Sequence, residues 1–253
     1  MTPIDQVDEQ ELRALLDHLA TGQLHEGEGY RGWGITPTMA GWNNLLYRVT
    51  GPGGDLVIKF VIRDRRDRAG REYHALLALR QAGLSLAPVP ILLDRRRYPQ
   101  PVVVQTWLEG PVSADPPAGD AEWERLLEHL AAVHSVTPES TSVALRRGVV
   151  DARTAEEGRT LVRRQMARLP LEDRPSSLQA LMRRFEMMTF PCWSRVAPVL
   201  CRVDENIFNV VRRPGAWASV DWENAGWGDP AFDVAQLMTH PAYTTYLPGA
   251  GRG

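Results

Sequence analysis

The sequence predicts an α+β protein in which a strand-rich part precedes a helix-rich part. Up to residue 108, short β-rich runs and Gly-rich turns surround one substantial helical pattern. After the proline-rich segment "PVSADPPAGD" at 111–120, helical spacings prevail. We therefore expect two domains. Residues 1–108 would hold an N-terminal helix, an antiparallel sheet and one further helix, and residues 109–253 would be mainly helical.

The elements of the first part follow from simple patterns. Leucines at helical spacing predict an opening amphipathic helix (Leu12, Leu15, Leu16 and Leu19). The runs "LLYRV" at 45–49 and "LVIKFV" at 56–61 flank the Gly-rich "TGPGGD" and predict a β-hairpin. A helix is expected within 65–83, where Gly83 would end it. Two apolar runs within 87–110 predict two more strands.

The second part predicts four helices and a hairpin. Apolar spacing indicates a helix at 121–136, and two stretches of mixed charge indicate helices near 153–169 and 175–189. The runs "IFNVV" and "AWASVDW" predict two paired strands. The last helix would begin after Asp229 and Pro230, a capping residue and a first-turn proline.

Charge and composition narrow the classes of function. The formal net charge is -2, so no strong field draws the chain to nucleic acid or to an anionic membrane. The start is acidic and amphipathic, unlike a secretory signal, and no apolar run approaches the roughly 20 residues that cross a bilayer. Cys192 and Cys201 form no CxxC pair and predict no metal site. We expect a cytoplasmic protein with neither a nucleic-acid nor a membrane partner.

Five polar residues stand out against apolar surroundings. Lys59 lies inside "LVIKFV", and Glu72 falls on the next helix, where it could pair with that lysine. Asp204 and Asn209 interrupt the apolar stretch "VLCRVDENIFNVV", and Asp221 closes an apolar strand. Taken singly, each has a structural explanation: an edge lysine whose stem packs on the sheet, a surface glutamate, turn-forming Asp and Asn, and a strand-end cap.

In this order the five residues match the parts of kinase-type phosphoryl transfer. The lysine would neutralise phosphate oxygens, and the glutamate would hold the lysine in place. Asp204 would orient an acceptor hydroxyl and take its proton. Asn209 and Asp221 would supply the hard oxygen ligands that Mg²⁺ prefers. None of the five residues alone is specific for this chemistry, whereas their order and spacing along the chain are.

Longer segments resemble the aminoglycoside phosphotransferase and choline kinase-like family over about residues 35–240. "CRVDENIFN" at 201–209 resembles the family's catalytic loop, usually His-Gly-Asp-x4-Asn. "VDWENAGWGDPAFDVA" at 220–235 resembles its metal-binding segment, and "REYHALLALRQAG" and "LLEHLAAVHSV" are similar to two of its helices. The resemblance implies a bilobal, protein-kinase-like fold that binds ATP (or GTP) and Mg²⁺ between its lobes.

The resemblance also implies how the nucleotide is held. "QTWLEG" at 105–110 would be the hinge between the lobes, and its backbone near Gln105 and Trp107 would meet the adenine. "TMAGWNNLLYRV" would cover the nucleotide, with Gly41 close to the phosphates. Asp229 and Asp233 match family positions that brace the catalytic region, and we interpret both as structural.

Two departures from the family pattern matter. Arg202 and Val203 replace the usual His-Gly before Asp204. Arg202 is expected to pair with a nearby carboxylate, and Val203 removes backbone freedom that glycine allows. The chain also stops after "HPAYTTYLPGAGRG", where family members continue with helices that build the acceptor pocket. We therefore expect the C-terminal helices to be short or missing.

The leading hypothesis is an ATP-dependent phosphotransferase that moves the γ-phosphoryl group to a hydroxyl of a small, aminoglycoside-like or amino-alcohol-like molecule. The alternative is a catalytically impaired or truncated kinase-like module that only binds nucleotide. A protein kinase is less favoured, because the sequence lacks Asp-Phe-Gly and Ala-Pro-Glu patterns. The arginines between 63 and 71 are interleaved with acids and are interpreted as a solvated helix face. His134 is interpreted as a packed histidine.

Overall fold

The computed structural model describes residues 8–22, 29–38, 44–51, 53–191, 196–240 and 243. The first half is built around an antiparallel sheet with the strand order β1-β2-β3-β4-β6-β5. These strands are β1 (Gly29–Tyr30), β2 (Trp33–Thr38), β3 (Asn44–Thr50), β4 (Leu56–Val61), β5 (Pro90–Asp94) and β6 (Val102–Thr106). β3 and β4 form the predicted hairpin, with Leu46 opposite Lys59. All six residues of β4, the strand between β3 and β6, are buried, and several of them pack in hydrophobic clusters with helix residues.

The helix α1 (Glu9–Leu19) covers one face of the sheet. Asp8 caps its first turn by accepting a hydrogen bond from the Gln10 N–H (2.9 Å). The four predicted leucines are buried and pack in one cluster with strand residues such as Trp33, Ile35 and Val49. Burying each leucine contributes roughly 1.5–3 kcal/mol, which is enough to hold a short helix on the sheet.

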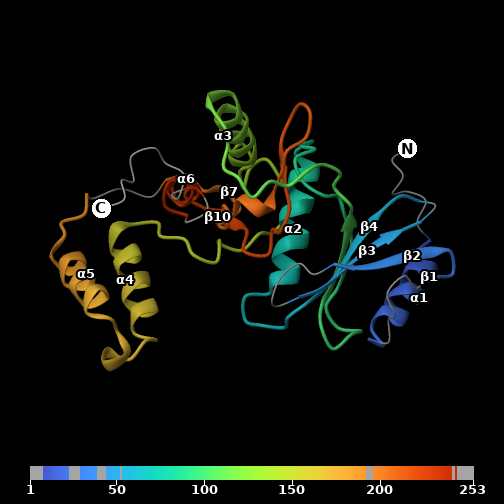
Figure 1. The fold of residues 1–253 in the computed structure, drawn as a ribbon, viewed down its shortest axis with the longest axis horizontal. Coiled ribbons are helices and arrows are strands. Elements are labelled where there is room, and N and C mark those ends of the chain that lie inside the picture. Colours follow the sequence, from blue (N-terminus) through green and yellow to red (C-terminus); the bar gives the residue numbers. More distant parts are fainter. Residues whose placement is uncertain are drawn as a thin grey trace.

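The helix α2 (Arg68–Gln81) lies between the sheet and the second half of the chain (Figure 1). Ala69, near its start, packs with Val61 and Val103 of the sheet. Leu79, near its end, belongs to a different cluster that includes Trp222 of the second half. One helix therefore contacts both halves and holds the sheet in place against the segments that follow residue 198.

The described part of the second half contains four helices and two small strand pairs. The helices are α3 (Asp120–His134), α4 (Ala155–Met166), α5 (Ser176–Met187) and α6 (Pro230–Thr239), with short 3₁₀ turns at Leu171–Asp173 and Ile207–Asn209. The antiparallel pairs are β7 (Val199–Cys201) with β10 (Gly226–Gly228), and β8 (Val210–Val211) with β9 (Ala218–Ser219). Both pairs join the segment 199–211 to the segment 218–228. The loops that carry Asp204 and Asp221 therefore lie side by side.

The helices α4 and α5 form a hairpin that stands apart from the rest of the fold (Figure 1). None of their residues is buried, and Leu181 and Met187 are 60% and 78% exposed. Glu186 ties the two helices together by accepting hydrogen bonds from Arg159 and Arg163. Exposed ion pairs of this kind add little net stability. This hairpin is therefore held far more weakly than α3 or α6.

Most predicted elements are confirmed close to their expected bounds, including the pairing of β8 with β9. The last helix begins as expected, because Asp229 accepts a hydrogen bond from the Ala231 N–H (2.9 Å) and Pro230 stands in the first turn. The sequence does not predict β1, β2, β7 or β10. Strands of two or three residues show no alternation, and glycine weakens the strand signal in the segment 29–38.

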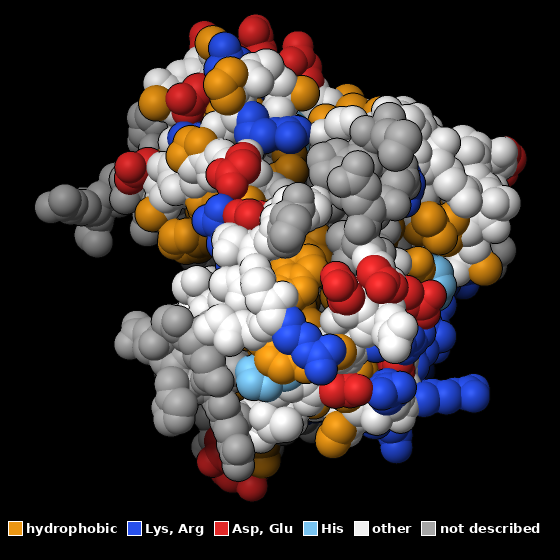
Figure 2. Space-filling view, turned by 90° about the vertical axis from the view of Figure 1, so that its right-hand side faces the viewer, with side chains coloured by type: hydrophobic (Ala, Val, Ile, Leu, Met, Phe, Trp, Pro, Cys, Tyr) orange, Lys and Arg blue, Asp and Glu red, His pale blue; other side chains and the backbone are white. Residues whose placement is uncertain are grey.

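The face at the sheet end of the molecule mixes both signs of charge (Figure 2). Several of the charged side chains in this half are paired, including Arg97 with Asp17 and Arg95 with Asp67. Within the described part of the chain, no helix has both the length and the apolar character that crossing a membrane requires.

Candidate active site

A cleft of about 590 Å³ lies between the sheet and the loops of the second half. Six of the eight predicted site residues line it: Lys59, Gln105, Trp107, Asp204, Asn209 and Asp221. Glu72 contacts Lys59 from α2, and Gly41 falls outside the described residues. The fold thus brings together segments from β4, the end of β6, the loop after β7 and the residues that follow β9.

Lys59 is held in the cleft by a buried ion pair. Its Nζ lies 2.6 Å from Glu72 Oε1 and 3.6 Å from Asp221 Oδ1. The alternative of an edge lysine is therefore wrong, because β4 is a central strand and both of these carboxylates face its ammonium. Burial lowers the pKa of Lys59, but Glu72 and Asp221 outweigh burial and leave that pKa above its ordinary value.

The chemical identity of this residue also stands out. Of the 29 lysine and arginine residues, Lys59 is the only lysine. An ammonium is a compact point charge, whereas a guanidinium is a wide planar fork. The only lysine of the chain therefore lies where β4, the Glu72 carboxylate of α2 and Asp221 meet.

Asn209 and Asp221 are brought together by the backbone. Asn209 ends a 3₁₀ turn, and its carbonyl accepts a hydrogen bond from the Val220 N–H (2.9 Å). The next residue, Asp221, takes a left-handed φ of 62°, which is uncommon for residues other than glycine. Its side chain stays 35% exposed and lines the cleft. An amide and a carboxylate are thus presented to the same space.

The loop that carries Asp204 is braced by Asp233 of α6. The Asp233 side chain is fully buried, and its two oxygens accept hydrogen bonds from the N–H groups of Arg202 (3.0 Å) and Val203 (3.1 Å). Val203 has a φ of 64°, a conformation that costs a β-branched residue on the order of 1–3 kcal/mol. Glycine would adopt it freely. Val203 is therefore strained, and the Asp233 carboxylate holds the strained backbone in place.

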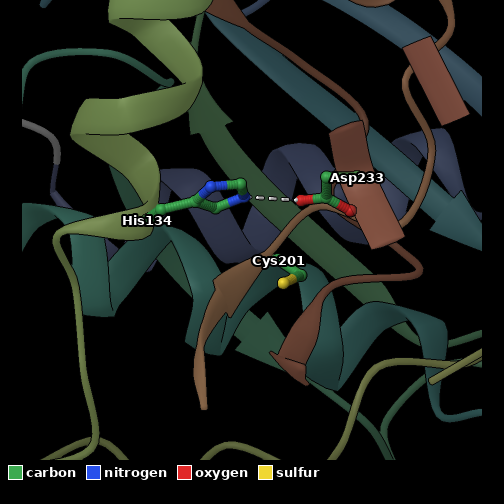
Figure 3. Close-up of side chains that lie close together, drawn as sticks. All are labelled: His134, Cys201 and Asp233. Atoms are coloured by element: carbon green, nitrogen blue, oxygen red, sulfur yellow. Dashed lines mark hydrogen bonds and ion pairs between the residues drawn. The ribbon is translucent and has the colours of Figure 1, made fainter. Parts of the chain in front are cut away.

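Asp233 also faces His134 of α3 and Cys201 of β7 (Figure 3). His134 Nε2 lies 3.1 Å from Asp233 Oδ2, so His134 is a packed histidine, as expected. The three side chains lie close enough together to be considered as metal ligands. However, both Asp233 oxygens already accept backbone hydrogen bonds, and burial raises the pKa of the Cys201 thiol. A metal would need the thiolate. We therefore interpret this group as a hydrogen-bonded brace.

Asp204 stands at the edge of the cleft and is partly buried. Burial raises the pKa of its carboxyl group above the ordinary value, the Arg202 guanidinium opposes the rise, and Asp221 adds to it. A carboxylate with a raised pKa is a stronger base than one in open water. The position and the basicity of Asp204 both suit proton abstraction.

Glu223 links the two halves of the molecule across the cleft. Its carboxylate accepts hydrogen bonds from Arg68 of α2 and from Asn44 of β3. Arg71 donates to the carbonyls of Arg147 and Ala225. The prediction of a solvated arginine face is therefore wrong for Arg68 and Arg71. Besides local contacts with Asp64 and Arg66, both arginines have partners in the second half of the chain, and local spacing does not reveal such distant partners.

The donor set of the cleft suits a hard divalent cation. Asp221 offers carboxylate oxygens, and Asn209 offers an amide oxygen. Mg²⁺ takes such ligands, keeps several waters and needs only one or two carboxylates beside substrate phosphates. The residues present therefore fit Mg²⁺.

The sequence model of the phosphotransferase enzyme family (APH) matches residues 34–252. The chain belongs to this family. The match covers the sheet, the cleft and the loops around Asp204 and Asp221. Among curated protein sequences, none matches this member of the APH family.

Solved structures similar to this APH family member include the macrolide 2'-phosphotransferase MphH from Brachybacterium faecium. It is 21% identical, with a TM-score of 0.58 over 95% of this chain and 84% of that chain. Spectinomycin phosphotransferase APH(9)-Ia, in complex with ADP and spectinomycin, is 15% identical, with a TM-score of 0.55 over 94% and 75% of the two chains. A choline/ethanolamine kinase family protein from Mesorhizobium loti is 17% identical, with a TM-score of 0.58 over 91% and 76%. These likenesses confirm the predicted kinase-like α+β fold.

Proposed function

We propose that this chain transfers the γ-phosphoryl group of ATP to a hydroxyl group of a small molecule. The observation that carries the proposal is the convergence of Lys59, Asp204, Asn209 and Asp221 on one cleft. Membership of the phosphotransferase family and the kinase-like fold support it. We further propose that the two lobes divide at residues 108 and 109, with the nucleotide between them, and that the protein acts in the cytoplasm.

Lys59 is proposed to bind the α- and β-phosphates, and Glu72 is proposed to hold the lysine in place. The ammonium is already fixed 2.6 Å from Glu72 Oε1, so it meets phosphate oxygens without reorientation. Preorganised charges of this kind act strongly in a partly desolvated site. The ion pair therefore supplies both the charge and its position.

The end of β6 is proposed to bind the adenine. The Trp107 N–H donates to the Asp55 carbonyl (2.8 Å), so this amide is used within the sheet. Among the described residues, the Leu108 N–H has no hydrogen-bond partner, and the buried Gln105 Oε1 has none either. Leu108 and Gln105 both line the cleft. They would meet the polar edge of the base, and Trp107 would contribute its ring rather than its amide.

Asp204 is proposed to act as the general base. It would take the proton of the acceptor hydroxyl as that oxygen bonds to the γ-phosphorus, while the bond from the γ-phosphorus to the β-phosphate oxygen breaks and ADP leaves. Asn209 and Asp221 would hold Mg²⁺, which when bound neutralises phosphate charge. Asp233 would keep the Asp204 loop in place during transfer through its hydrogen bonds to Arg202 and Val203.

The acceptor is proposed to be an aminoglycoside-like or amino-alcohol-like molecule. The similar solved structures include a macrolide phosphotransferase, a spectinomycin phosphotransferase and a choline/ethanolamine kinase family protein. The names of these three proteins support a small molecule as the phosphoryl acceptor. The panel of acceptors to test should therefore contain aminoglycosides, macrolides, spectinomycin, choline and ethanolamine.

Transfer of radiolabelled γ-phosphate from ATP to this panel tests the proposal. We expect Mg²⁺-dependent transfer to at least one acceptor. The single lysine provides a second readout, because a lysine-directed reagent can modify only Lys59 and the N-terminal amine. MgATP should protect Lys59 and leave the N-terminus reactive. No transfer together with no protection would refute the proposal.

The second candidate function is a nucleotide-binding module without transferase activity. The strained Val203 beside Asp204 favours it. Protection of Lys59 by MgATP without transfer to any acceptor would identify this function.

A further inference from the structure

We infer that Arg202 and Glu205 form one positioning unit, which fixes the loop between Asp204 and Asn209 in its working shape. The inference rests on the proposed function in so far as Asp204 and Asn209 take part in transfer. It concerns two residues that flank Asp204 in the sequence and do not line the cleft.

The two side chains make a two-point contact inside the protein. Arg202 Nη2 lies 2.9 Å from Glu205 Oε2, and Arg202 Nε lies 3.4 Å from Glu205 Oε1. Both side chains are 2% exposed. Fork-to-fork contacts of this kind fix orientation as well as distance. The pair therefore links the two ends of the short segment 202–205, which contains Asp204.

The guanidinium also reaches the far end of the loop. Arg202 Nη1 lies 3.5 Å from the Asn209 carbonyl oxygen, which the Val220 N–H contacts as well. At the near end, the Glu205 N–H donates to Gln236 Oε1 of α6 (3.2 Å). One arginine thus connects the start of the loop, its middle and the backbone of Asn209.

Stability alone does not explain a buried pair at this position. Removing two charges from water costs several kcal/mol per ion, and apolar residues of similar volume are often as stable or more stable. A buried pair can instead select one conformation. The Arg202 charge also opposes the burial-driven rise in the pKa of Asp204. Arg202 therefore affects Asp204 in two ways: its contacts hold the loop, and its charge opposes the rise in the pKa of Asp204.

The test separates loop positioning from general stability by removing both charges together. Arg202→Met alone leaves Glu205 buried without a partner, so this variant should be strongly destabilised. The double variant Arg202→Met/Glu205→Met leaves no lone charge and should regain most of the melting temperature. A matched control removes the exposed pair on α1 and the 94–98 turn, as Arg97→Met/Asp17→Asn.

Two readouts are measured on the double variant. We expect amide hydrogen exchange over residues 203–209 to quicken by about tenfold or more while β4 stays protected. We also expect kcat for the best acceptor to fall by about tenfold or more and the KM for ATP to change much less, because Asn209 keeps its hydrogen bond from the Val220 N–H. The control variant should change neither quantity.

Unchanged exchange over 203–209, or turnover within about twofold of wild type, would overturn the inference. Arg202→Lys keeps a charge opposite Glu205 and should show a smaller loosening of the same loop. If the double variant does not fold, Arg202→Lys takes its place in both measurements. If the wild type binds no nucleotide and transfers no phosphate, the proposed function has failed, and the exchange measurement alone decides the inference.

Discussion

The Asp204 loop and the α4–α5 hairpin differ in whether their charged side chains are buried or exposed. Arg202 and Glu205 of the loop and Asp233 of α6, which braces the loop, are buried, and each has a partner at hydrogen-bond distance. In the hairpin no residue is buried, and Glu186 meets its arginine partners in solvent. Both segments contain Arg–Glu pairs. Only their surroundings differ.

The comparison shows where this chain keeps charged side chains buried although burial is unfavourable in free energy. Burying a charge is unfavourable unless its partners are complete, whereas exposed pairs form and break with little change in free energy. A loop that keeps several buried charges beside one partly buried carboxylate, Asp204, is consistent with a functional role. A hairpin held by surface pairs carries no such constraint, and we expect changes there to matter least.

The largest effect is expected at Asp204 itself. Asp204→Asn should lower turnover by about 10²-fold or more, the scale of lost acid–base assistance, with the KM for ATP little changed. The fold should stay intact, because burial already disfavours the charged form of this group and raises its pKa. Steady-state kinetics with the best acceptor measures the change. Asp173→Asn, between α4 and α5, is the matched control, and equal turnover in the two variants would contradict the role of Asp204.

The next largest effect is expected at Lys59. Lys59→Met leaves Glu72 buried without its cation, which should cost about 3–5 kcal/mol of unfolding free energy. Lys59→Met/Glu72→Met should restore most of that stability and still bind ATP at least about tenfold more weakly, because the phosphates lose their charge partner. Urea unfolding and ATP titration give the two quantities. Wild-type affinity in the double variant would show that the pair serves only the fold.

A smaller effect concerns the core beneath the loop. His129 is buried and contacts the Trp217 carbonyl and the Ser219 hydroxyl, both at 3.1 Å. Burial lowers its pKa from an ordinary 6.5 to about 3. The folded state therefore binds fewer protons than the unfolded state between these values. The stability that His129 contributes is complete above pH 6.5 and is lost as the pH falls toward 3.

The loss attributable to His129 should approach about 1.4 kcal/mol per pH unit. Urea midpoints between pH 7.5 and pH 5 measure it, because most carboxylates titrate at lower pH. His129→Gln should flatten this slope. An unchanged slope in the variant would show that another group causes the loss.

The smallest effect is expected in the hairpin. Glu186→Gln removes the contacts with Arg159 and Arg163, yet the melting temperature should move by no more than about 2 °C. High salt should reduce even that change, because it screens exposed charges. A large loss of stability would mean that the hairpin is packed more firmly than its exposure indicates.

Local spacing predicted much of the candidate site. The hairpin of β3 and β4 holds Lys59, and the pairing of β8 with β9 joins Asn209 to the segment that ends at Asp221. Each of these relations spans few residues, so periodicity and turn residues carry the signal.

Relations between distant segments were out of reach of the sequence. The contact between Arg68 and Glu223 joins α2 to the segment after β9, and neither residue differs locally from a solvated charge. The buried partner of Arg202 was expected only in general terms, whereas the structure identifies Glu205. Desolvation depends on what packs on a residue from elsewhere in the chain, and single-sequence patterns do not record that packing.

The most direct test of the account is calorimetric titration of ATP into the wild type and into Asp221→Asn, each with Mg²⁺ and with EDTA. The account predicts that the wild type binds ATP with Mg²⁺ and loses about tenfold or more in affinity with EDTA. It predicts that Asp221→Asn binds equally weakly under both conditions, because the metal has lost its carboxylate ligand. A folded wild type that binds no ATP, or a variant that keeps the full Mg²⁺ dependence, would contradict it.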